Sequence, residues 1–416
     1  MCNKLKLGII GIGNMGSSHA KNLKDGKCSE IELVAVADNN PERIEWAKEQ
    51  NLGKNITYFD NAIKMLDSGI IDSCIIAVPH YSHTYFAIEC LKRNIHVMVE
   101  KPAGVYTLQV KDMNDCAKNH PDTVFGMMFN QRTNCVYRKL RELVHSGKYG
   151  QIRRTNWIIT NWYRPQAYYD SGSWRATWAG EGGGVLLNQC PHQLDLWQWI
   201  CGMPIKVRAN LHFGKWHNIE VEHDVTAYVE YANGATGVFI TTTGDARGTN
   251  RFEIQMDKAK FVVEDGKLIM EEFEMSEPDF SKKNTQPFGS MKSTVIIPET
   301  DGENTQHVGV LNAWADAILH NGNLVAKGEE GLNGLTLSNA MHLSAFLNRE
   351  VELPFDDKLF YDELMKRVKN SSKKADIKAG LILGSILFVA QPFQIIGLKY
   401  TSPSKQAFLL ASYVVI

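Results

Sequence analysis

A short segment in the middle of the chain combines polar side chains with glycines. GGGVLLNQCPHQLD, residues 182–195, contains Asn188, His192 and Asp195 at spacings of four and three residues. If the segment after the glycines is helical, these side chains share one face of the helix. Pro191 has no N–H to donate, so it fits only a first helical turn or a kink. The histidine is a candidate acid or base, because imidazole titrates near neutral pH, although the triplet can equally cap the helix.

A second group of polar residues follows two predicted strands in the first third of the chain. The strand in HVMVEKPAG, residues 96–104, ends in Glu100 and Lys101. The preceding strand continues as AVPHYSH, which supplies Val78, Pro79, His80 and His83. Ligands of doubly wound sheets bind outside the carboxyl ends of the strands, so we expect these residues to border a cofactor crevice. A structural ion pair between Glu100 and Lys101 is the alternative.

The first predicted strand leads into a glycine-rich turn. GIIGIGNMGSSHA places Gly11, Gly13 and Gly16 in a GxGxxG pattern between a strand and a helix. The glycines permit a tight turn, close approach of a pyrophosphate and close helix–strand packing. We therefore expect the turn, with Asn14 and Met15, to bind a dinucleotide at the N-terminus of the helix.

The next predicted strand ends in VAVAD, which places Asp38 beyond the glycine-rich turn. A carboxylate there can accept hydrogen bonds from ribose hydroxyls, and its charge repels a 2′-phosphate. Asn39 and Asn40, which follow it, are not basic. The pattern favours NAD over NADP as the cofactor. Asp38 can also cap the helix that begins at Pro41, instead of or as well as binding ribose.

The pattern of apolar residues changes near residue 127. Residues 1–126 alternate short β-branched runs with helical segments, which predicts an α/β Rossmann domain with a parallel, doubly wound sheet. Residues 127–368 contain longer alternating strands and hairpin turn signals, which predict an α+β domain with a mainly antiparallel sheet. We expect helices at 182–201, 310–322 and 331–349 in this second domain.

Composition excludes several function classes. The chain has 416 residues, a formal net charge of −1 and no long basic stretch on a folded segment, so nucleic acid is not an expected partner. Eight cysteines without a CxxC pair indicate reduced thiols rather than disulfides or zinc. The N-terminus has no signal-peptide pattern, so we expect a cytoplasmic protein.

The last segment, residues 369–416, differs from the rest. A basic linker precedes an uncharged stretch at 379–398, which is about the length needed to cross a bilayer. Residues 379–416 resemble one helical hairpin of drug/metabolite-type transporters, and one hairpin cannot form a transport pathway. We interpret the segment as a fused fragment; a membrane anchor and a buried helix are the alternatives, and we expect membrane association only if the segment is an anchor.

Aromatic residues concentrate ahead of the histidine segment. Six of the nine tryptophans lie between residues 157 and 199, a density that suits a carbohydrate surface or a large core. The connection 161–184 offers candidates for a sugar-lining lid, namely Trp162, Arg164, Tyr168 and Arg175. Asn130 and Arg132 are weaker candidates. The segment 212–224 holds three histidines among carboxylates, but its alternation fits a strand and turn, so we assign no metal site.

Together, GIGNMG, VAVAD, AVPHYSHTYFA, HVMVEKPAG and GGGVLLNQCPHQLD resemble the glucose–fructose oxidoreductase/inositol dehydrogenase (Gfo/Idh/MocA) family over about residues 5–365. The resemblance implies a Rossmann domain followed by a domain with an open-faced, mainly antiparallel sheet, with NAD or NADP held between them. It also implies a sugar or cyclitol substrate and homodimers or homotetramers that pair their sheets.

The same resemblance implies roles for individual residues. The lysine of the family's EKP motif falls on Lys101 and its active-site histidine on His192, while Asn188 stands where the family often has an aspartate. A carboxylate there would hold an imidazolium, whereas asparagine only orients the ring or a substrate hydroxyl. Asp195 is expected to anchor the helix or His192. The expected catalytic residues are Lys101, His192 and Asn188, and the expected substrate contacts are Trp162, Arg164, Tyr168, Arg175, Asn188 and His192. The expected cofactor contacts are Gly11, Gly13, Asn14, Met15, Gly16, Asp38, Val78, Pro79, His80, His83, Glu100, Lys101 and Asn130.

These residue types suit hydride transfer between a secondary alcohol and a nicotinamide. The hydroxyl proton must leave as the hydride leaves, and either His192 or Lys101 can accept it. The other would stabilise the developing alkoxide. Two alternatives use the same scaffold: a glycosidase that recycles NAD, and a non-catalytic NAD(H)-binding regulator.

Overall fold

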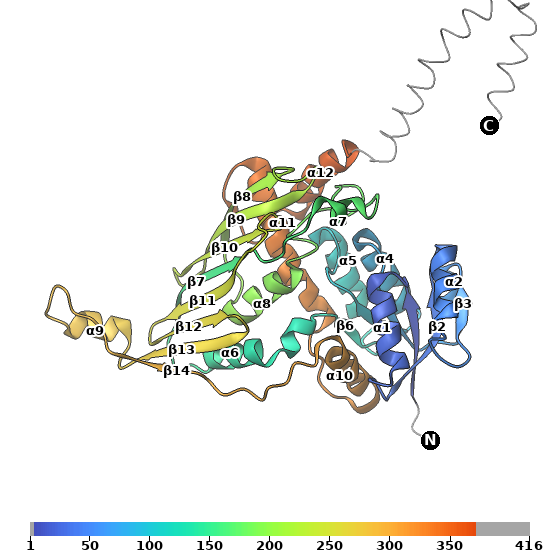
Figure 1. The fold of residues 1–416 in the computed structure, drawn as a ribbon, viewed down its shortest axis with the longest axis horizontal. Helices are drawn as coiled ribbons and strands as arrows, with labels where there is room; N and C mark the ends of the chain where they lie inside the picture. Colours follow the sequence, from blue (N-terminus) through green and yellow to red (C-terminus); the bar gives the residue numbers. More distant parts are fainter. Residues whose placement is uncertain (1–3, 372–416) are drawn as a thin grey trace, which may run out of the picture.

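The computed structural model describes residues 4–371, which are organised by two β-sheets (Figure 1). The amino-terminal sheet is entirely parallel, in the order β3-β2-β1-β4-β5-β6. Its strands are β1 (Leu5–Ile10), β2 (Ile31–Ala37), β3 (Thr57–Phe59), β4 (Ser73–Ile76), β5 (His96–Val99) and β6 (Phe125–Met127). The strand order switches between β1 and β4, which is where such sheets bind ligands. The predicted doubly wound Rossmann domain is confirmed.

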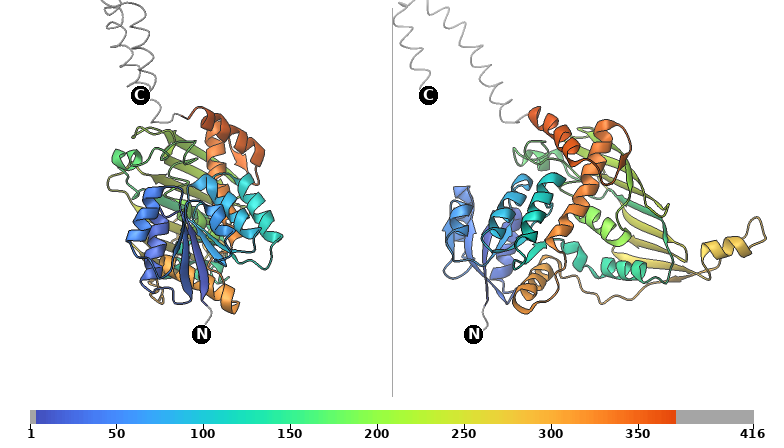
Figure 2. Two further views of the ribbon diagram at one scale, coloured as in Figure 1. Left: turned by 90° about the vertical axis from the view of Figure 1, so that its right-hand side faces the viewer. Right: turned by 180° about the vertical axis from the view of Figure 1, so that it is seen from behind.

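Helices lie on both sides of this sheet (Figure 2). They are α1 (Asn14–Lys24), α2 (Pro41–Glu49), α3 (Ala62–Leu66), α4 (His83–Leu91) and α5 (Thr107–Lys118), with a 3-10 turn, η1 (His80–Ser82), before α4. Every residue of β4 is buried, as expected for a central parallel strand covered on both faces.

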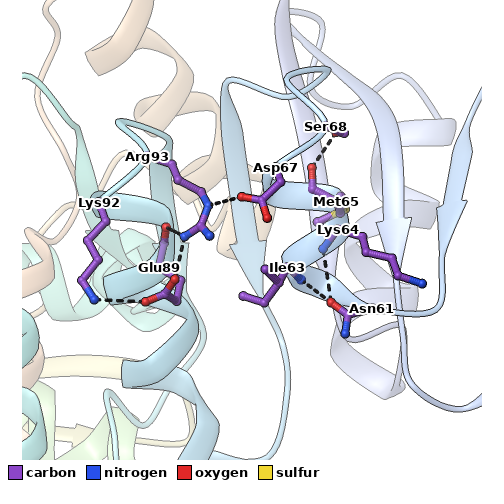
Figure 3. A network of polar contacts seen from close by, with 9 residues as sticks. All are labelled: Asn61, Ile63, Lys64, Met65, Asp67, Ser68, Glu89, Lys92 and Arg93. Carbon is purple, nitrogen blue, oxygen red and sulfur yellow. Dashed lines mark hydrogen bonds and ion pairs between the residues drawn. The ribbon is translucent and has the colours of Figure 1, made fainter.

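An ion-pair network on the surface joins the ends of α3 and α4 (Figure 3). Arg93 donates to Asp67 at 2.7 Å and to Glu89 at 2.6 Å, and Lys92 donates to Glu89 at 3.1 Å. Because several of these side chains are exposed, the network contributes little to the free energy of unfolding. The buried strands contribute most of the stability of the domain.

The second sheet has nine strands in the order β14-β13-β12-β11-β7-β10-β9-β8-β15. Its strands are β7 (Ile152–Ile159), β8 (Lys206–Phe213), β9 (Glu222–Glu230), β10 (Thr236–Thr242), β11 (Asn250–Met256), β12 (Ala259–Glu264), β13 (Lys267–Phe273), β14 (Ser293–Ile296) and β15 (Val351–Glu352). Neighbours β7 and β10 are parallel, and the other adjacent pairs are antiparallel. The prediction of a mainly antiparallel sheet is confirmed.

One face of this sheet carries the helices that lie between it and the Rossmann domain (Figure 1). These are α6 (Cys135–His145), α8 (Pro191–Cys201) and α11 (Gly331–Leu347). In both figures no helix of residues 4–371 lies over the opposite face, so the sheet is open-faced. The remaining elements are η2 (Asn130–Thr133), α7 (Gln166–Asp170), α9 (Glu277–Lys283), η3 (Gly328–Glu330) and α12 (Asp357–Lys369).

Helix α10 (Gln306–His320) differs from our expectation that it would close the second domain. Its buried residues Leu311 and Trp314 join the core formed by β1, β2 and α1 of the Rossmann domain. Trp314 Nε1 also donates to the Val124 carbonyl oxygen at 3.4 Å. The chain therefore returns to the first domain because the apolar face of α10 completes that core.

The expectations for the last segment fall largely outside the described residues. The apolar stretch 379–398 and the transporter-like segment 379–416 lie beyond residue 371. Between residues 4 and 371, every helix is too short or too polar to span a bilayer.

Candidate active site

The glycine-rich turn between β1 and α1 leaves room for a phosphate group. Gly11 has a φ of +88°, which favours glycine, and an added Cβ there would lie 2.5 Å from the Ala77 carbonyl oxygen. An added Cβ at Gly16 would lie 1.9 Å from the Gly11 carbonyl oxygen. Around Gly13, the N-cap of α1, an added Cβ would meet no atom within 4 Å. This open space at a helix N-terminus fits the pyrophosphate of a dinucleotide.

Other predicted cofactor contacts surround this turn. Asn14 is exposed and Met15 is half-buried in the first turn of α1. Val78 follows β4, and its Cγ1 would lie 3.0 Å from a Cβ added at Gly11. Pro79, next to it, is exposed. The structure thus brings the ends of β1 and β4 together, as the sequence predicts.

Asp38 connects the end of β2 to the glycine-rich turn. Its Oδ2 accepts a hydrogen bond from Ile12 N at 2.8 Å, and its Oδ1 accepts one from Asn40 N at 2.9 Å. The cap of α2 is Asn40, whose side chain accepts from Glu42 N at 2.9 Å. The alternative in which Asp38 itself caps α2 is therefore wrong. The carboxylate braces the turn and keeps lone pairs free for a ribose hydroxyl.

Arg43 on α2 is a residue of this region that the sequence analysis missed. Its Nε donates to the Ile12 carbonyl oxygen at 2.9 Å, and its Nη2 donates to Ser17 Oγ at 2.7 Å. The guanidinium also lies over the Trp46 ring, 4.8 Å from its centroid. Its position five residues after Asp38, in the first turns of α2, is the feature that could have indicated it.

Glu100 lies beneath the crevice rather than at its surface. It is 3% exposed, and its Oε1 lies 2.6 Å from Nε2 of the fully buried His19 on α1. Burial would raise the pKa of Glu100, but the hydrogen bond and charge of His19 outweigh burial and lower it to about 2. The predicted ion pair with the side chain of Lys101 is replaced by this pair. Glu100 therefore links the end of β5 to α1.

The two histidines after β4 differ in their roles. His83 is buried, and its ring nitrogens lie 2.6 Å from the Pro102 carbonyl oxygen and 2.7 Å from the Val78 carbonyl oxygen. Both nitrogens face backbone carbonyl oxygens, and the neutral ring donates its single N–H to one of them, so neither nitrogen is directed to a cofactor, which corrects our expectation of a direct cofactor contact. His80 Nδ1 lies 3.2 Å from the Glu181 carbonyl oxygen, so this contact joins the segment after β4 to the second domain. Burial lowers the pKa of both rings, so they are neutral at neutral pH.

Lys101 reaches across from the end of β5 to the second domain. Its Nζ donates to the Asn188 carbonyl oxygen at 2.9 Å. Burial lowers the pKa of this ammonium, while the charges of Glu100 and Glu181 oppose the shift. Lys101 and Asn188, which the sequence analysis expects in one site, are therefore in contact.

Helix α8 begins later than expected, which changes the relation between Asn188 and His192. The helix starts at Pro191, so His192 lies in its first turn and Asn188 precedes it. The reason is Glu222 on β9, whose carboxylate accepts hydrogen bonds from Gly184 N and Leu186 N at 2.8–3.0 Å. Because Glu222 binds the N–H groups of Gly184 and Leu186, residues 185–189 form a turn instead of the first turn of a helix. The prediction of a helix over 182–201 with one shared polar face is therefore wrong.

His192 is half-buried and hydrogen-bonds no residue in the described part of the chain. Its ring lies edge-on to Phe129, with centroids 6.5 Å apart. Burial and then the charge of Lys101 lower its pKa to about 3. The imidazole is therefore neutral at neutral pH and can accept a proton.

Asp195 anchors α8 through Arg132. The carboxylate accepts from Arg132 Nη2 at 2.6 Å and from Arg132 Nε at 2.8 Å, and it accepts from Gln198 Nε2 at 3.0 Å. Arg132 Nη1 also donates to Glu330 at 2.6 Å. Both side chains are 1% exposed. Arg132 is thus committed to the helix, which corrects our view of it as a substrate candidate.

Asn130, an expected cofactor contact, lies in η2 at the junction of the domains. It is 4% exposed, and its Nδ2 donates to Gln306 Oε1 on α10. Its Oδ1 is buried and has no partner among residues 4–371. The sequence places Asn130 at this junction but gives no indication of its contact with α10.

Three of the predicted substrate residues, Arg164, Arg175 and Asn188, contact Tyr168 on α7. The Tyr168 hydroxyl oxygen accepts from Arg175 Nη1 at 2.9 Å, from Gln189 Nε2 at 3.2 Å and from Asn188 Nδ2 at 3.4 Å. Arg164 lies over the Tyr168 ring, with the guanidinium carbon 5.2 Å from the centroid. The structure thus brings the arginines and the tyrosine to one side of Asn188.

Trp162 precedes this group in the chain. Its Nε1 is buried without a hydrogen-bond partner among the described residues, and Arg164 lies 5.7 Å from its ring centroid. An indole N–H without a partner is unusual in a protein interior. Trp162 is therefore retained as a substrate candidate.

Glu181 is a buried carboxylate beside Asn188 that the sequence analysis missed. It is 3% exposed, and its carboxylate accepts hydrogen bonds from Asn188 Nδ2 and, at 2.6 Å, from Ala176 N. Burial raises the pKa of Glu181 to about 7, against the opposing effects of these hydrogen bonds and of Arg175. Its position directly before the three glycines is the signal that could have identified it.

The histidine segment 212–224 has structural contacts. His223 Nε2 accepts from Trp216 N at 2.9 Å. His342 Nε2 on α11 lies 2.9 Å from Glu222, the residue that holds the glycine turn. In residues 4–371 no group of three or more His, Cys, Asp or Glu side chains is placed to hold a metal ion.

Comparisons with known proteins agree with this architecture. The oxidoreductase family with an NAD-binding Rossmann fold matches residues 5–127, and the GFO/IDH/MocA C-terminal domain matches residues 137–262. The chain is 25% identical over 241 residues to myo-inositol 2-dehydrogenase of Thermotoga maritima, which covers 56% of this chain and 67% of that protein. It is 28% identical over 253 residues to D-glucoside 3-dehydrogenase of Escherichia coli K12, covering 55% and 68%.

A solved structure shows the same fold over most of the chain. The WlbA dehydrogenase of Chromobacterium violaceum, in complex with NADH and UDP-GlcNAcA, aligns with a TM-score of 0.73 at 25% identity, covering 85% of this chain and 97% of that one. The glycine-rich turn, the two sheets and the two family matches lead to one conclusion. The chain belongs to the GFO/IDH/MocA family of oxidoreductases, and its amino-terminal domain is an NAD-binding Rossmann domain.

Proposed function

We propose that the protein is an NAD-dependent dehydrogenase that oxidises a secondary alcohol of a sugar or cyclitol. The observation that carries this proposal is the hydrogen bond from Lys101 Nζ to the Asn188 carbonyl oxygen, which joins the end of β5 to the turn just before His192. Lys101 comes from the end of β5 and His192 from the first turn of α8, and the charge of Lys101 acts on the imidazole. One amine and one neutral imidazole beside a dinucleotide site are suited to move the proton of a hydroxyl group.

NAD fits the amino-terminal part of the site. The open space over Gly13 accepts a pyrophosphate, and the carboxylate of Asp38 can accept a ribose hydroxyl. Bound NAD supplies the hydride acceptor. The negative charge of Asp38 disfavours a 2′-phosphate, and Arg43 is occupied by Ile12 and Ser17, which supports NAD over NADP.

The protein side chains then handle the hydroxyl group. His192 has no hydrogen-bond partner in residues 4–371, so its neutral ring is free to accept a hydrogen bond from the reacting hydroxyl. Lys101 uses one N–H on the Asn188 carbonyl and keeps others for the same substrate oxygen, where it stabilises negative charge. Tyr168, Arg164 and Arg175 supply donors for further hydroxyls, as a sugar or cyclitol requires.

The comparisons support the substrate class. The relatives named above act, by their names, on myo-inositol and on D-glucosides. We propose in addition that two or four copies associate through the open face of the nine-stranded sheet, which size-exclusion chromatography with light scattering tests directly.

The function is tested by following absorbance at 340 nm with the full chain, NAD or NADP, and a panel of hexoses, anhydrosugars, inositols and glycosides. We expect NADH to appear with one of these classes and NADP to be the poorer cofactor. The control variant is Lys366→Met on the exposed face of α12, which should keep full activity. If the protein binds NAD, as judged by thermal stabilisation, and yet produces no NADH with any substrate, the proposal is wrong. Glycoside cleavage without net NADH would then identify the NAD-recycling alternative.

A further inference from the structure

We infer that Glu181 is a positioning residue that makes Asn188 a hydrogen-bond acceptor for the substrate. The inference rests on the proposed function and adds to it a residue that determines how the substrate hydroxyl is held. Glu181 lies in the loop before α8, where its carboxylate faces Asn188 and its backbone carbonyl oxygen lies 3.2 Å from His80 Nδ1 of the Rossmann domain.

The orientation of the Asn188 amide follows from the chemistry of its neighbours. An ionised carboxylate only accepts hydrogen bonds, so the group that faces Glu181 must be the NH₂ of Asn188. The second amide hydrogen points to the Tyr168 hydroxyl at 3.4 Å. Both donors of Asn188 are therefore used by the protein. The carbonyl Oδ1 receives no hydrogen bond from residues 4–371 and remains available for a substrate O–H.

Asn188 also contacts Lys101, the residue proposed to bind the reacting oxygen. Lys101 Nζ donates to the backbone carbonyl oxygen of Asn188 at 2.9 Å, and the side-chain amide of Asn188 donates to Glu181. Asn188 therefore connects the lysine to Glu181. The reacting hydroxyl can thus accept from Lys101 and give its proton to His192, while a neighbouring substrate hydroxyl donates to Asn188 Oδ1. Glu181 acts through Asn188 and does not itself contact the substrate.

Protonation of Glu181 would reverse this arrangement. One carboxylate oxygen accepts from Ala176 N, so the proton would sit on the oxygen that faces Asn188, and the Asn188 amide would turn its oxygen toward this O–H. The NH₂ group would then face the substrate, where it cannot accept a hydroxyl proton. Because burial raises the pKa of Glu181 to about 7, this reversal falls near neutral pH. The charged or titratable groups around Glu181 are Lys101, Arg175, Glu222, His80 and Tyr169.

The first test compares pH profiles of the full-length wild-type protein and Glu181→Gln, with the substrate and NAD identified above. We expect kcat of the wild type to fall as the pH drops through about 7, and this acid limb to be absent in Glu181→Gln. Glutamine keeps an acceptor for Ala176 N but presents an NH₂ toward Asn188, so kcat/KM should fall about 10- to 100-fold. Glu264→Gln on β12 is the matched control and should keep the wild-type profile.

A rescue variant separates positioning from simple structural support. In Glu181→Gln/Asn188→Asp, the glutamine NH₂ can donate to the new carboxylate, which again offers an acceptor to the substrate. We expect this double variant to recover most of the activity lost in Glu181→Gln. Glu181→Asp, which keeps the charge, serves if Glu181→Gln does not fold, and it should keep an acid limb. An unchanged acid limb in Glu181→Gln, or a double variant no more active than Glu181→Gln, would overturn the inference.

A readout without substrate distinguishes failure of this inference from failure of the proposed function. Because the folded-state pKa of Glu181 is raised, its contribution to stability is present below its ordinary pKa and is lost as the pH rises through about 7. The melting temperature of Glu181→Gln relative to wild type should therefore increase by about 3 °C between pH 5 and pH 8. A constant difference would show that Glu181 is not the titrating group. If the melting curves behave as expected but no substrate yields NADH, the proposed function fails and the titration of Glu181 stands.

Discussion

Replacing Asp195 by asparagine should destabilise the protein strongly, although the two side chains have nearly the same shape. The carboxylate holds Arg132 with two hydrogen bonds of 2.6 and 2.8 Å, and both side chains are 1% exposed. Asparagine offers one acceptor in place of two and turns an NH₂ group toward the guanidinium. Arg132 would keep its contact to the partly exposed Glu330 but lose the fully buried carboxylate that takes two of its hydrogen bonds.

The expected magnitude follows from leaving one member of a buried ion pair without its partner, which costs about 3–5 kcal/mol. The pair as a whole contributes much less. Burial raises the pKa of Asp195 despite the nearby charge of Arg132, which shows that desolvation outweighs the attraction for this carboxylate. The double variant Asp195→Leu/Arg132→Met should therefore be more stable than Asp195→Asn alone.

Urea denaturation followed by circular dichroism measures both effects. Asp362→Asn is the matched control, because Asp362 pairs with Lys358 on the exposed helix α12 and should cost less than about 1 kcal/mol. Since Asp195 lies on α8 one turn after His192, we also expect lower kcat in Asp195→Asn. A loss of unfolding free energy below about 1 kcal/mol in Asp195→Asn would refute the reasoning.

Three further substitutions test other parts of the site. Lys101→Met should lower kcat by about 10²- to 10⁴-fold and leave the NAD dissociation constant unchanged, since Lys101 acts on the substrate oxygen. A loss of NAD affinity as large as the loss of kcat would contradict this role. Asp38→Ala should weaken NAD binding by about 1–2 kcal/mol and reduce the preference for NAD over NADP, as measured by fluorescence titration with both cofactors. An unchanged ratio of the two affinities would exclude Asp38 as the origin of the preference. Glu222→Gln should lower the free energy of unfolding by about 2–3 kcal/mol, because its NH₂ group would face the N–H groups of Gly184 and Leu186. A wild-type urea midpoint would show that other contacts hold this turn.

The Rossmann domain could be predicted because its determinants are local. The buried strands are short apolar runs, and the glycines of the turn lie within a few residues of one another. Lys101 lies two residues after β5 and His192 is the second residue of α8, so both could be located from nearby elements, while their catalytic roles stay predictions. The alternation of the strands in the second domain was equally visible in the sequence.

The start of α8 could not be predicted from its own sequence. The segment 182–190 has helical spacing, but Glu222 binds its N–H groups from a strand more than 30 residues away. The position of α10 has a similar origin, because its apolar face fits the core of the first domain and local periodicity does not specify a partner. Asn188 consequently precedes the helix that carries His192.

Glu181 and Arg43 were missed for a related reason. Their importance comes from what they contact: Glu181 faces Asn188 inside the second domain, and Arg43 reaches back to the turn at Ile12. A glutamate before a glycine run and an arginine on an amphipathic helix are common in sequences without such roles. The predicted roles of His83 and Arg132 were altered by the same kind of long-range contact.

The central claim is that a hydride leaves a carbinol carbon of a sugar or cyclitol for NAD in this site, and isotope transfer tests it most directly. The wild-type protein would be incubated with NAD and an active substrate that carries deuterium on the reacting carbon, and the resulting dinucleotide would be examined by NMR. The account predicts NADH with one deuterium at C4 of the nicotinamide ring and one equivalent of ketone product. NADH without deuterium, or substrate conversion in which the deuterium never reaches the nicotinamide, would contradict it.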